Sequence, residues 1–261
     1  MSTVPKGRFV WYDLLTTDQE KAIDYYSEVV GWTTEDWPGA PTRYAMWKAQ
    51  SGAMIGGSVQ FPPDQASLHP HWLGYIATPN VDDTVTQATK LGARVVKPAD
   101  DIPTVGRSAV LADPQGAIFG VFTPEGDAPG HEGAADIGEV SWHELYTTDY
   151  EAAFKFYSQL FGWEKGQAMD MGPMGIYQMF TRNGQNIGGM MNKPDASMPS
   201  GWTYYFRVPD VNEVAERIKA AGGKVTNGPM EVPGGDKIVM GSDPQGAPFA
   251  VHEVKASQAA A

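Results

Sequence analysis

The chain has 261 residues, of which 42% are hydrophobic and 19% are charged, and its formal net charge at pH 7 is -12. This length is natural for two globular domains, and an acidic surface repels phosphate groups, so neither nucleic acid nor an anionic membrane is an expected partner. Cysteine is absent, which excludes disulfides and thiolate chemistry. The N-terminus lacks the apolar core of a signal peptide, and no apolar run approaches a membrane span, so we expect a cytoplasmic protein.

The first elements can be predicted in chain order. Residues 10–15 are rich in apolar and aromatic side chains, which indicates a strand. Thr17 and Glu20 have the spacing of a capping box, and the apolar residues that follow predict an amphipathic helix ending at Gly31. Two further strands are predicted at 43–49 and 55–61.

The same order of elements then recurs. Residues 71–78 predict a strand, and residues 81–92 predict a helix that ends in glycine. Three more strands are predicted at 93–98, 107–113 and 117–123. The second set is therefore a βαβββ module, and we assign the same order to the first set, in which the strand directly after the helix is the least clearly marked in the sequence.

The sequence contains an internal repeat of two copies. WYDLLTTD at 11–18 matches WHELYTTD at 142–149 at an offset of 142 − 11 = 131. DPQGA at 113–117 recurs at 243–247, at an offset of 243 − 113 = 130. Such a long-period repeat indicates one structural unit per copy. We therefore predict domains at 1–126 and 136–256 with a Gly- and Pro-rich linker at 127–135.

The repeated pattern resembles the vicinal oxygen chelate superfamily, which includes glyoxalase I, bleomycin-resistance proteins and extradiol dioxygenases. The resemblance rests on the TTD motif before a helix with YY or FY and then GW, and on DPQGA near the end of each copy. It implies an α+β fold of two tandem domains, each made of paired βαβββ modules that curl into a half-open barrel. It also implies a divalent metal that chelates two oxygens of a substrate.

The metal-ligand positions that the resemblance assigns hold other residues here. In the first copy they are Trp11, Leu73 and Gly120, and in the second copy they are Trp142, Thr203 and Ala250. Divalent ions need oxygen or nitrogen donors, and none of these side chains is a usual ligand. We therefore name no metal-ligating residue and leave the cofactor unknown.

Strand alternation places other polar residues on the inner face of the second copy. A step of two residues from each ligand position leads to Glu144, Tyr205 and His252. These are candidate catalytic groups for acid–base chemistry that is either metal-free or supported by a weakly bound metal. The alternative is that Glu144 is a hydrogen-bonded polar residue of the barrel and His252 a partly exposed strand-end residue.

Further residues are candidates for substrate binding. The same step in the first copy leads to Asp13 and Tyr75. Trp11 and Trp142 are aromatic residues at matched positions that suit a flat or apolar ligand. Arg107 and Lys237 are matched cations that could hold an anionic group, or else be solvated strand-end residues. All six are candidate substrate-binding residues: Asp13, Tyr75, Trp11, Trp142, Arg107 and Lys237.

Two histidines are expected to take no part in catalysis or binding. His143 precedes Glu144 and, being one residue off the ligand phase, should point away from the inner face. His131 lies in the Gly-rich linker and is expected to have no role.

Three classes of function stay open. The chain could be a lyase or isomerase acting on a small oxygenated metabolite, a non-catalytic protein that sequesters a small molecule, or a structural or signalling protein that reuses the barrel. The expected partner is a small-molecule ligand. The two copies are expected to pair within one chain as a pseudo-dimer, which would allow a monomer.

Overall fold

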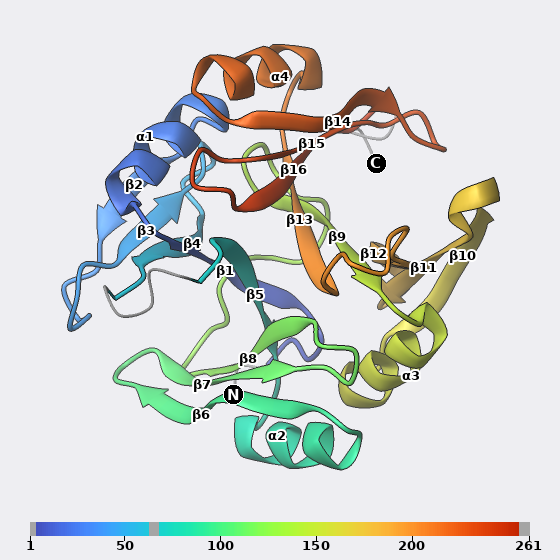
Figure 1. Cartoon of the computed structure of the whole chain (residues 1–261). Coiled ribbons are helices and arrows are strands. Elements are labelled where there is room, and N and C mark those ends of the chain that lie inside the picture. The colour runs from blue at the N-terminus through green and yellow to red at the C-terminus, as the bar shows by residue number, and fades with distance from the viewer. Residues whose placement is uncertain (1–3, 63–67, 256–261) are drawn as a thin grey trace. The chain divides into compact units, whose positions relative to one another are not determined.

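The computed structural model describes residues 4–62 and 68–255. The first copy contains β1 Phe9–Thr16, α1 Gln19–Val29, β2 Thr33–Asp36, β3 Ala45–Lys48, β4 Met54–Gln60, β5 His71–Ala77, α2 Val81–Lys90, β6 Arg94–Ile102, β7 Gly106–Ala112 and β8 Ile118–Pro124. The second copy contains β9 Val140–Thr147, α3 Tyr150–Phe161, β10 Glu164–Asp170, the 3-10 helix Gly172–Met174, β11 Ile176–Arg182, β12 Gln185–Asn192, β13 Gly201–Arg207, α4 Val211–Ala220, β14 Lys224–Glu231, β15 Lys237–Ser242 and β16 Pro248–Glu253. The predicted βαβββ order is therefore present in four modules (Figure 1).

Each copy forms one eight-stranded mixed sheet. The strand order is β2-β3-β4-β1-β5-β8-β7-β6 in the first copy and β10-β11-β12-β9-β13-β16-β15-β14 in the second. The two orders are the same when the strands are renumbered by copy. The predicted α+β fold with two tandem domains is confirmed.

Both copies begin their first helix in the same way, and the predicted capping box of Thr17 and Glu20 is wrong. Asp18 is the N-cap of α1, and its carboxylate accepts a hydrogen bond from the Lys21 amide at 3.2 Å. Asp149 is the N-cap of α3 and accepts from two backbone amides. Aspartate is as good an N-cap as threonine, and it stands one residue nearer the helix. Gly31 does follow α1 with a φ of 84°, as predicted.

Contacts divide the chain into two compact units, each of which contains parts of both copies. The first unit comprises residues 1–11, 73–129 and 143–202, and the second comprises residues 12–72, 130–142 and 203–261. Within the first unit α2 lies beside α3, and within the second α1 lies beside α4 (Figure 1). Within each unit, elements of both copies therefore pack together, and an intrachain pseudo-dimer stays a prediction.

The repeated YY/FY and DPQGA motifs meet in the core of each unit. In the second unit the Tyr26 hydroxyl donates to Asp243 at 3.3 Å and accepts from the Trp72 indole at 3.0 Å. In the first unit Tyr157 donates to Asp113 at 3.0 Å and accepts from Trp202 at 3.1 Å. Each bond to aspartate joins a tyrosine of one copy to a carboxylate of the other.

The aspartates also close their own turns. Asp113 accepts from the amides of Gln115 and Ala117, and Asp243 does so in its own DPQGA motif. Burial raises the pKa of both carboxyl groups, and the hydrogen bonds oppose that rise. The DPQGA motif is therefore a structural connection between copies.

The IGG motifs allow close approach between strands and aromatic rings. A Cβ on Gly56 would lie 1.8 Å from the Tyr12 carbonyl oxygen, and a Cβ on Gly57 would lie 2.2 Å from the Tyr44 ring. Gly188 and Gly189 are equally close to the His143 carbonyl and the Tyr177 ring. No side chain fits at these four positions, which explains why the pair of glycines recurs in both copies.

Candidate functional site

A histidine and an aspartate of the second copy are brought together by the β15–β16 hairpin. The antiparallel register pairs Ile238 with His252, so Asp236, just before β15, lies beside the end of β16. His252 Nε2 is 3.1 Å from Asp236 Oδ2. The other carboxylate oxygen of Asp236 accepts from the Lys255 amide at 2.8 Å, which fixes its orientation.

Ser141 on β9 completes a hydrogen-bonded row of three side chains. Its Oγ lies 2.8 Å from His252 Nδ1. A carboxylate can only accept, so neutral His252 carries its proton on Nε2 and accepts the Ser141 hydroxyl proton at Nδ1. The same hydroxyl lies 3.2 Å from the Tyr205 carbonyl oxygen, which gives its proton a second acceptor.

His252 is buried rather than partly exposed, with 9% of its surface accessible. Burial lowers the pKa of its imidazole, and the Asp236 carboxylate partly opposes that effect. The ring is therefore neutral at pH 7 and able to accept a proton. Sequence reasoning found His252 but missed Ser141 and Asp236.

The matched positions of the first copy are apolar. Val10, Phe122 and Gly106 stand where the second copy has Ser141, His252 and Asp236 (141 − 131 = 10, 252 − 130 = 122, 236 − 130 = 106). Val10 and Phe122 belong to a buried cluster with Ala77, against which Tyr75 and Val105 pack. At these matched positions the second copy has three polar residues, whereas the first copy has two apolar residues and a glycine. This difference is a sequence signal that could have revealed the row.

Glu144 is a buried carboxylate of the first compact unit. It lies on β9 opposite Gly189 of the parallel strand β12, and 6% of its surface is exposed. The Tyr146 phenol, two residues along the same face, hydrogen-bonds to it, and burial together with this carboxylate raises the pKa of Tyr146. The matched residue of Tyr146 in the first copy is Leu15, so this pair also is specific to the second copy.

Asp13 is held differently from Glu144. The Tyr44 hydroxyl donates to Asp13 Oδ1 at 2.6 Å, and the Tyr44 ring lies over Gly57. The other candidate of the first copy, Tyr75, lies in the first unit, where its ring covers Gly120. A Cβ at Gly120 would lie 2.3 Å from that ring.

The three predicted catalytic residues are distributed over both compact units. Glu144 belongs to the first unit, whereas Tyr205 and His252 belong to the second. Tyr205 and His252 lie on paired parallel strands, β13 and β16, whose register matches Tyr205 with Ala250. A single site containing all three residues stays a prediction.

The two matched cations are already paired with carboxylates of the protein. Arg107 bonds to both oxygens of Asp82 at 2.9 and 3.0 Å and to Asp101 at 2.8 Å. The Lys237 amine bonds to Glu253 at 3.2 Å. These contacts favour the strand-end role of the two cations. Their binding of a substrate anion stays a prediction.

The matched aromatic residues fall into two groups. Trp11 and Trp142, the predicted ligand-binding tryptophans, are half-buried. The other matched aromatics are buried in the core of their unit: Trp47, Trp72, Phe180 and Trp202. Of these matched residues, Trp11 and Trp142 are therefore the ones exposed enough to contact a ligand without a rearrangement of the core.

His143 has the structural role expected from the strand phase. Its ring stacks on Phe9, with centroids 4.0 Å apart, and its Nδ1 donates to the Ile187 carbonyl at 2.6 Å. Burial lowers its pKa to about 4, so the ring is neutral at pH 7.

The positions at which the family resemblance expects metal ligands do not fit a metal. Gly120 has no side chain and lies under the Tyr75 ring, and Ala250 is fully buried. Trp11, Trp142 and Leu73 carry no metal-donating atom, and a neutral Thr203 hydroxyl alone would be a weak ligand. No chemical step is assigned to a metal at these positions.

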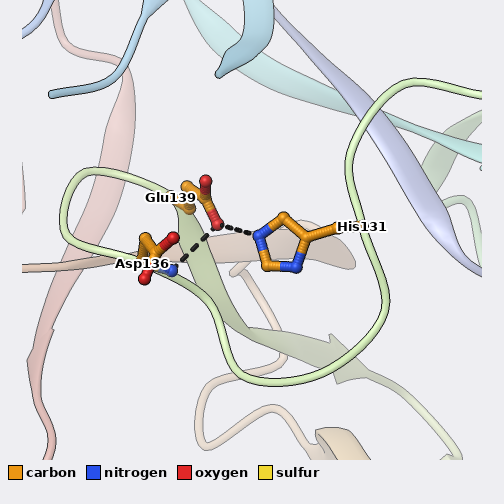
Figure 2. Close-up of side chains that lie close together, drawn as sticks. All are labelled: His131, Asp136 and Glu139. Atoms are coloured by element: carbon orange, nitrogen blue, oxygen red, sulfur yellow. Dashed lines mark hydrogen bonds and ion pairs between the residues drawn. The ribbon is translucent and has the colours of Figure 1, made fainter. Parts of the chain in front are cut away.

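A different group of possible metal ligands lies in the segment between the copies (Figure 2). His131, Asp136 and Glu139 each offer one ligand atom, and these atoms lie within 4.8 Å of one another. His131 Nε2 is 2.8 Å from Glu139 Oε2, which also accepts from the Asp136 amide at 2.9 Å. The composition of the linker predicts no role for His131, whereas the structure places it against a buried carboxylate.

No helix within the described residues is long and apolar enough to cross a membrane.

Family models match both copies. A glyoxalase-like domain model covers residues 10–122, and the model of the glyoxalase/bleomycin resistance protein/dioxygenase superfamily covers residues 138–251. Among curated relatives, "Putative glyoxylase CFP32" of Mycobacterium tuberculosis is 33% identical over 247 residues and 92% of each chain. The anthracycline biosynthesis protein DnrV of Streptomyces peucetius is 28% identical over all of this chain and 98% of its own.

Solved structures share the fold at low sequence identity. The Mn(II)-bound glyoxalase of Novosphingobium aromaticivorans matches 97% of this chain and 83% of its own, with a TM-score of 0.67 and 17% identity. The 2,3-dioxygenase LapB of Pseudomonas sp. KL28 matches 96% of this chain and 93% of its own, with a TM-score of 0.67 and 12% identity. With its duplicated modules and these matches, the chain is a two-domain member of the glyoxalase/bleomycin resistance protein/dioxygenase superfamily.

Proposed function

We propose that the protein binds a small oxygenated metabolite and that its second copy transfers a proton on that metabolite, as a lyase or isomerase that needs no metal at the positions usual for its family. The observation that carries the proposal is the row Ser141–His252–Asp236, in which a buried neutral imidazole lies between a hydroxyl and a carboxylate. Such a row suits general acid–base catalysis.

The roles of the three side chains follow from their hydrogen bonds. His252 Nδ1 accepts a proton from the substrate, directly or through the Ser141 hydroxyl. Asp236 accepts the Nε2 proton, holds the ring in one tautomer and stabilises the imidazolium that forms. The aspartate of a serine protease triad acts on its histidine in the same way, and here the arrangement is assigned only to proton transfer.

Glu144 is proposed as a second acid–base group. Its carboxylate is buried and bonded to Tyr146, so it is shielded from water and fixed in orientation. A carboxylate held in this way can serve as a general acid or base within the first unit. Within the second unit Tyr205, Asp13 and the half-buried Trp142 are proposed as ligand-contacting residues, and within the first unit Tyr75 and the half-buried Trp11.

The test is deuterium exchange without metal. Chelator-treated protein in D₂O is incubated with α-hydroxy ketones and hydroxylated aromatic ketones, and deuterium uptake is followed by mass spectrometry. His252→Gln should slow uptake by about 10²-fold or more, because removal of a general base costs this much. His69→Gln, which changes an exposed histidine, is the matched control. Equal rates in wild type and His252→Gln, or a strict need for added metal, would refute the proposal.

A second candidate function is sequestration of the metabolite without turnover. The apolar cluster around Val10 and Phe122 favours this role for the first copy, because it holds no acid–base group at the positions of Ser141, His252 and Asp236. Equilibrium dialysis with a hydroxylated anthraquinone would show binding in both His252→Gln and wild type. Binding without any deuterium uptake by wild type would favour sequestration.

A further inference from the structure

We propose that His131, Asp136 and Glu139 form a binding site for a divalent transition-metal ion such as Zn²⁺ in the segment that joins the two copies. This site is separate from the positions at which the family resemblance expects a metal. The proposal does not depend on the proposed function.

The backbone brings the two carboxylates together. The Glu139 amide donates to the Asp136 carbonyl at 3.0 Å, which closes a turn between the two residues. The Asp136 amide in turn donates to Glu139 Oε2 at 2.9 Å. Figure 2 shows one Glu139 carboxylate oxygen joined by dashed lines to the Asp136 amide nitrogen and to the His131 ring. The turn therefore holds both acidic side chains near each other.

The hydrogen bonds of His131 select the tautomer that binds metals. Its Nδ1 lies 2.9 Å from the Glu132 carbonyl oxygen, which can only accept, so Nδ1 carries a proton. In neutral imidazole, Nε2 then has a lone pair, and it faces the Glu139 Oε2 lone pairs at 2.8 Å. Two acceptors at this distance need a second proton or a cation between them. A histidine with Nδ1–H bonded to a carbonyl and Nε2 directed at carboxylates is the usual arrangement around a protein-bound metal.

The charge at Glu139 is not neutralised by a permanent cation. Its side chain is only 10% exposed, and within the described parts of the chain its single ion pair is with His131. The Ser51 hydroxyl donates to its other oxygen at 3.2 Å. The Arg207 guanidinium bonds to the Ala135 carbonyl of the same segment. A bound divalent cation would therefore compensate two carboxylates, one of which is buried.

The ligand set suits a borderline ion better than a hard one. One imidazole and two carboxylates, with water at a remaining position, match the donors that Zn²⁺ takes, whereas Mg²⁺ and Ca²⁺ prefer oxygen alone. Ligands about 2.0–2.1 Å from Zn²⁺ in a tetrahedral site lie about 3.3 Å apart, so the His131–Glu139 contact would open slightly on binding.

The test is calorimetric titration of the tag-free protein with ZnCl₂, with CoCl₂ absorption as a second readout of coordination. Wild type should bind one ion, and its thermal midpoint should rise because the ion binds only the folded state. His131→Asn and Glu139→Gln should each weaken binding by about tenfold or more. Glu132→Gln, which changes the carboxylate next to His131 but outside the cluster, is the matched control.

The outcomes separate the two proposals. Absence of Zn²⁺ binding by wild type, or equal binding by wild type and His131→Asn, would overturn the metal site. His131→Asn lies in an exposed segment and serves if Glu139→Gln, at a buried residue, fails to fold. His252→Gln should bind Zn²⁺ as wild type does, so loss of proton transfer and loss of metal binding are measured independently.

Discussion

At matched positions, the second copy has a row of hydrogen-bonded polar side chains and the first copy has an apolar cluster. Ser141, His252 and Asp236 are hydrogen-bonded in the second compact unit, while Val10 and Phe122 pack with Ala77 in the first. Both sets stand on equivalent strands of sheets with the same strand order. Because the two copies share the same strand order, the contrast between the polar row and the apolar cluster comes from the side chains at these positions.

The comparison teaches that the two copies share the side chains that connect them and differ in the side chains at this place. The residues that join the copies are the same in both, as the bonds Tyr26–Asp243 and Tyr157–Asp113 show. The residues capable of proton transfer differ. The connection between the copies is therefore symmetric while the polar row is found in the second copy, and the first copy provides an internal control for the second.

The largest expected effect comes from breaking the polar row at its carboxylate. Asp236→Asn replaces a carboxylate, which can only accept, by an amide whose NH₂ can donate to His252 Nε2, so the ring can adopt the tautomer that is protonated at Nδ1 and cannot accept there. Deuterium uptake should fall by about 10²-fold or more, since the equivalent change in a serine protease triad is severe.

The control for that change is Asp100→Asn, at an exposed aspartate of β6 whose carboxylate accepts a local amide. ¹⁵N NMR of the His252 ring reports the tautomer directly. An unchanged His252 tautomer in Asp236→Asn would refute the positioning role even if the protein were less stable.

Strand phase predicts much of this arrangement from the sequence. The family resemblance supplies the reference positions on the strands, and alternation from them separates Glu144 from His143 and selects His252 as the histidine of interest. His143 is buried against Phe9 and the Ile187 carbonyl, and His252 lies in the polar row. The placement of His143 agrees with its predicted structural role, whereas a catalytic role of His252 stays a prediction.

Tertiary partners could not be predicted in the same way. Ser141 and His252 are 111 residues apart, and Asp236 meets His252 only because a hairpin register brings them together. Gly-rich composition around His131 indicates a linker, whereas a turn at Asp136–Glu139 determines the contacts of this histidine. Composition reports that a segment lacks regular structure but not where its side chains lie.

The second prediction concerns His143, whose matched residue in the first copy is Tyr12. Folded His143 takes up a proton only near its pKa of about 4, whereas the unfolded chain does so near the ordinary pKa of 6.5. Between these values the unfolded state binds more protons, so stability falls as pH drops from 6.5 toward 4. The full effect is about 3 kcal/mol in the free energy of unfolding, from about 2.5 pKa steps (6.5 − 4) at roughly 1.36 kcal/mol each.

Urea unfolding at pH 7 and pH 4.5 measures this difference. His143→Gln can still donate to the Ile187 carbonyl but cannot titrate, so its stability should fall less over the same pH interval. If wild type and His143→Gln lose equal stability, the histidine is not the group responsible.

A third prediction tests the apolar cluster of the first copy by introducing a polar side chain into it. Phe122→His places an imidazole in the apolar cluster with Gly106 where Asp236 would stand, so no matched carboxylate is present to bond it. An unsatisfied buried polar group costs about 1–3 kcal/mol. Chemical unfolding at pH 8 should show this loss, and Phe122→Leu, which keeps the site apolar, should lose less. A loss no greater than that of Phe122→Leu would mean that the ring finds another partner.

The smallest expected effect is at Ser141. Ser141→Ala removes the hydroxyl from His252 Nδ1 while Asp236 still holds Nε2, and one hydrogen bond contributes about 1 kcal/mol. The matched change Val10→Ala in the first copy removes packing instead, and it should leave deuterium uptake unchanged while lowering stability by a similar amount. If Ser141 relays the proton, Ser141→Ala also slows uptake; if His252 contacts the substrate directly, the rate stays within a few-fold of wild type. Stability alone therefore cannot tell the two copies apart at this position, whereas the rate of proton transfer can.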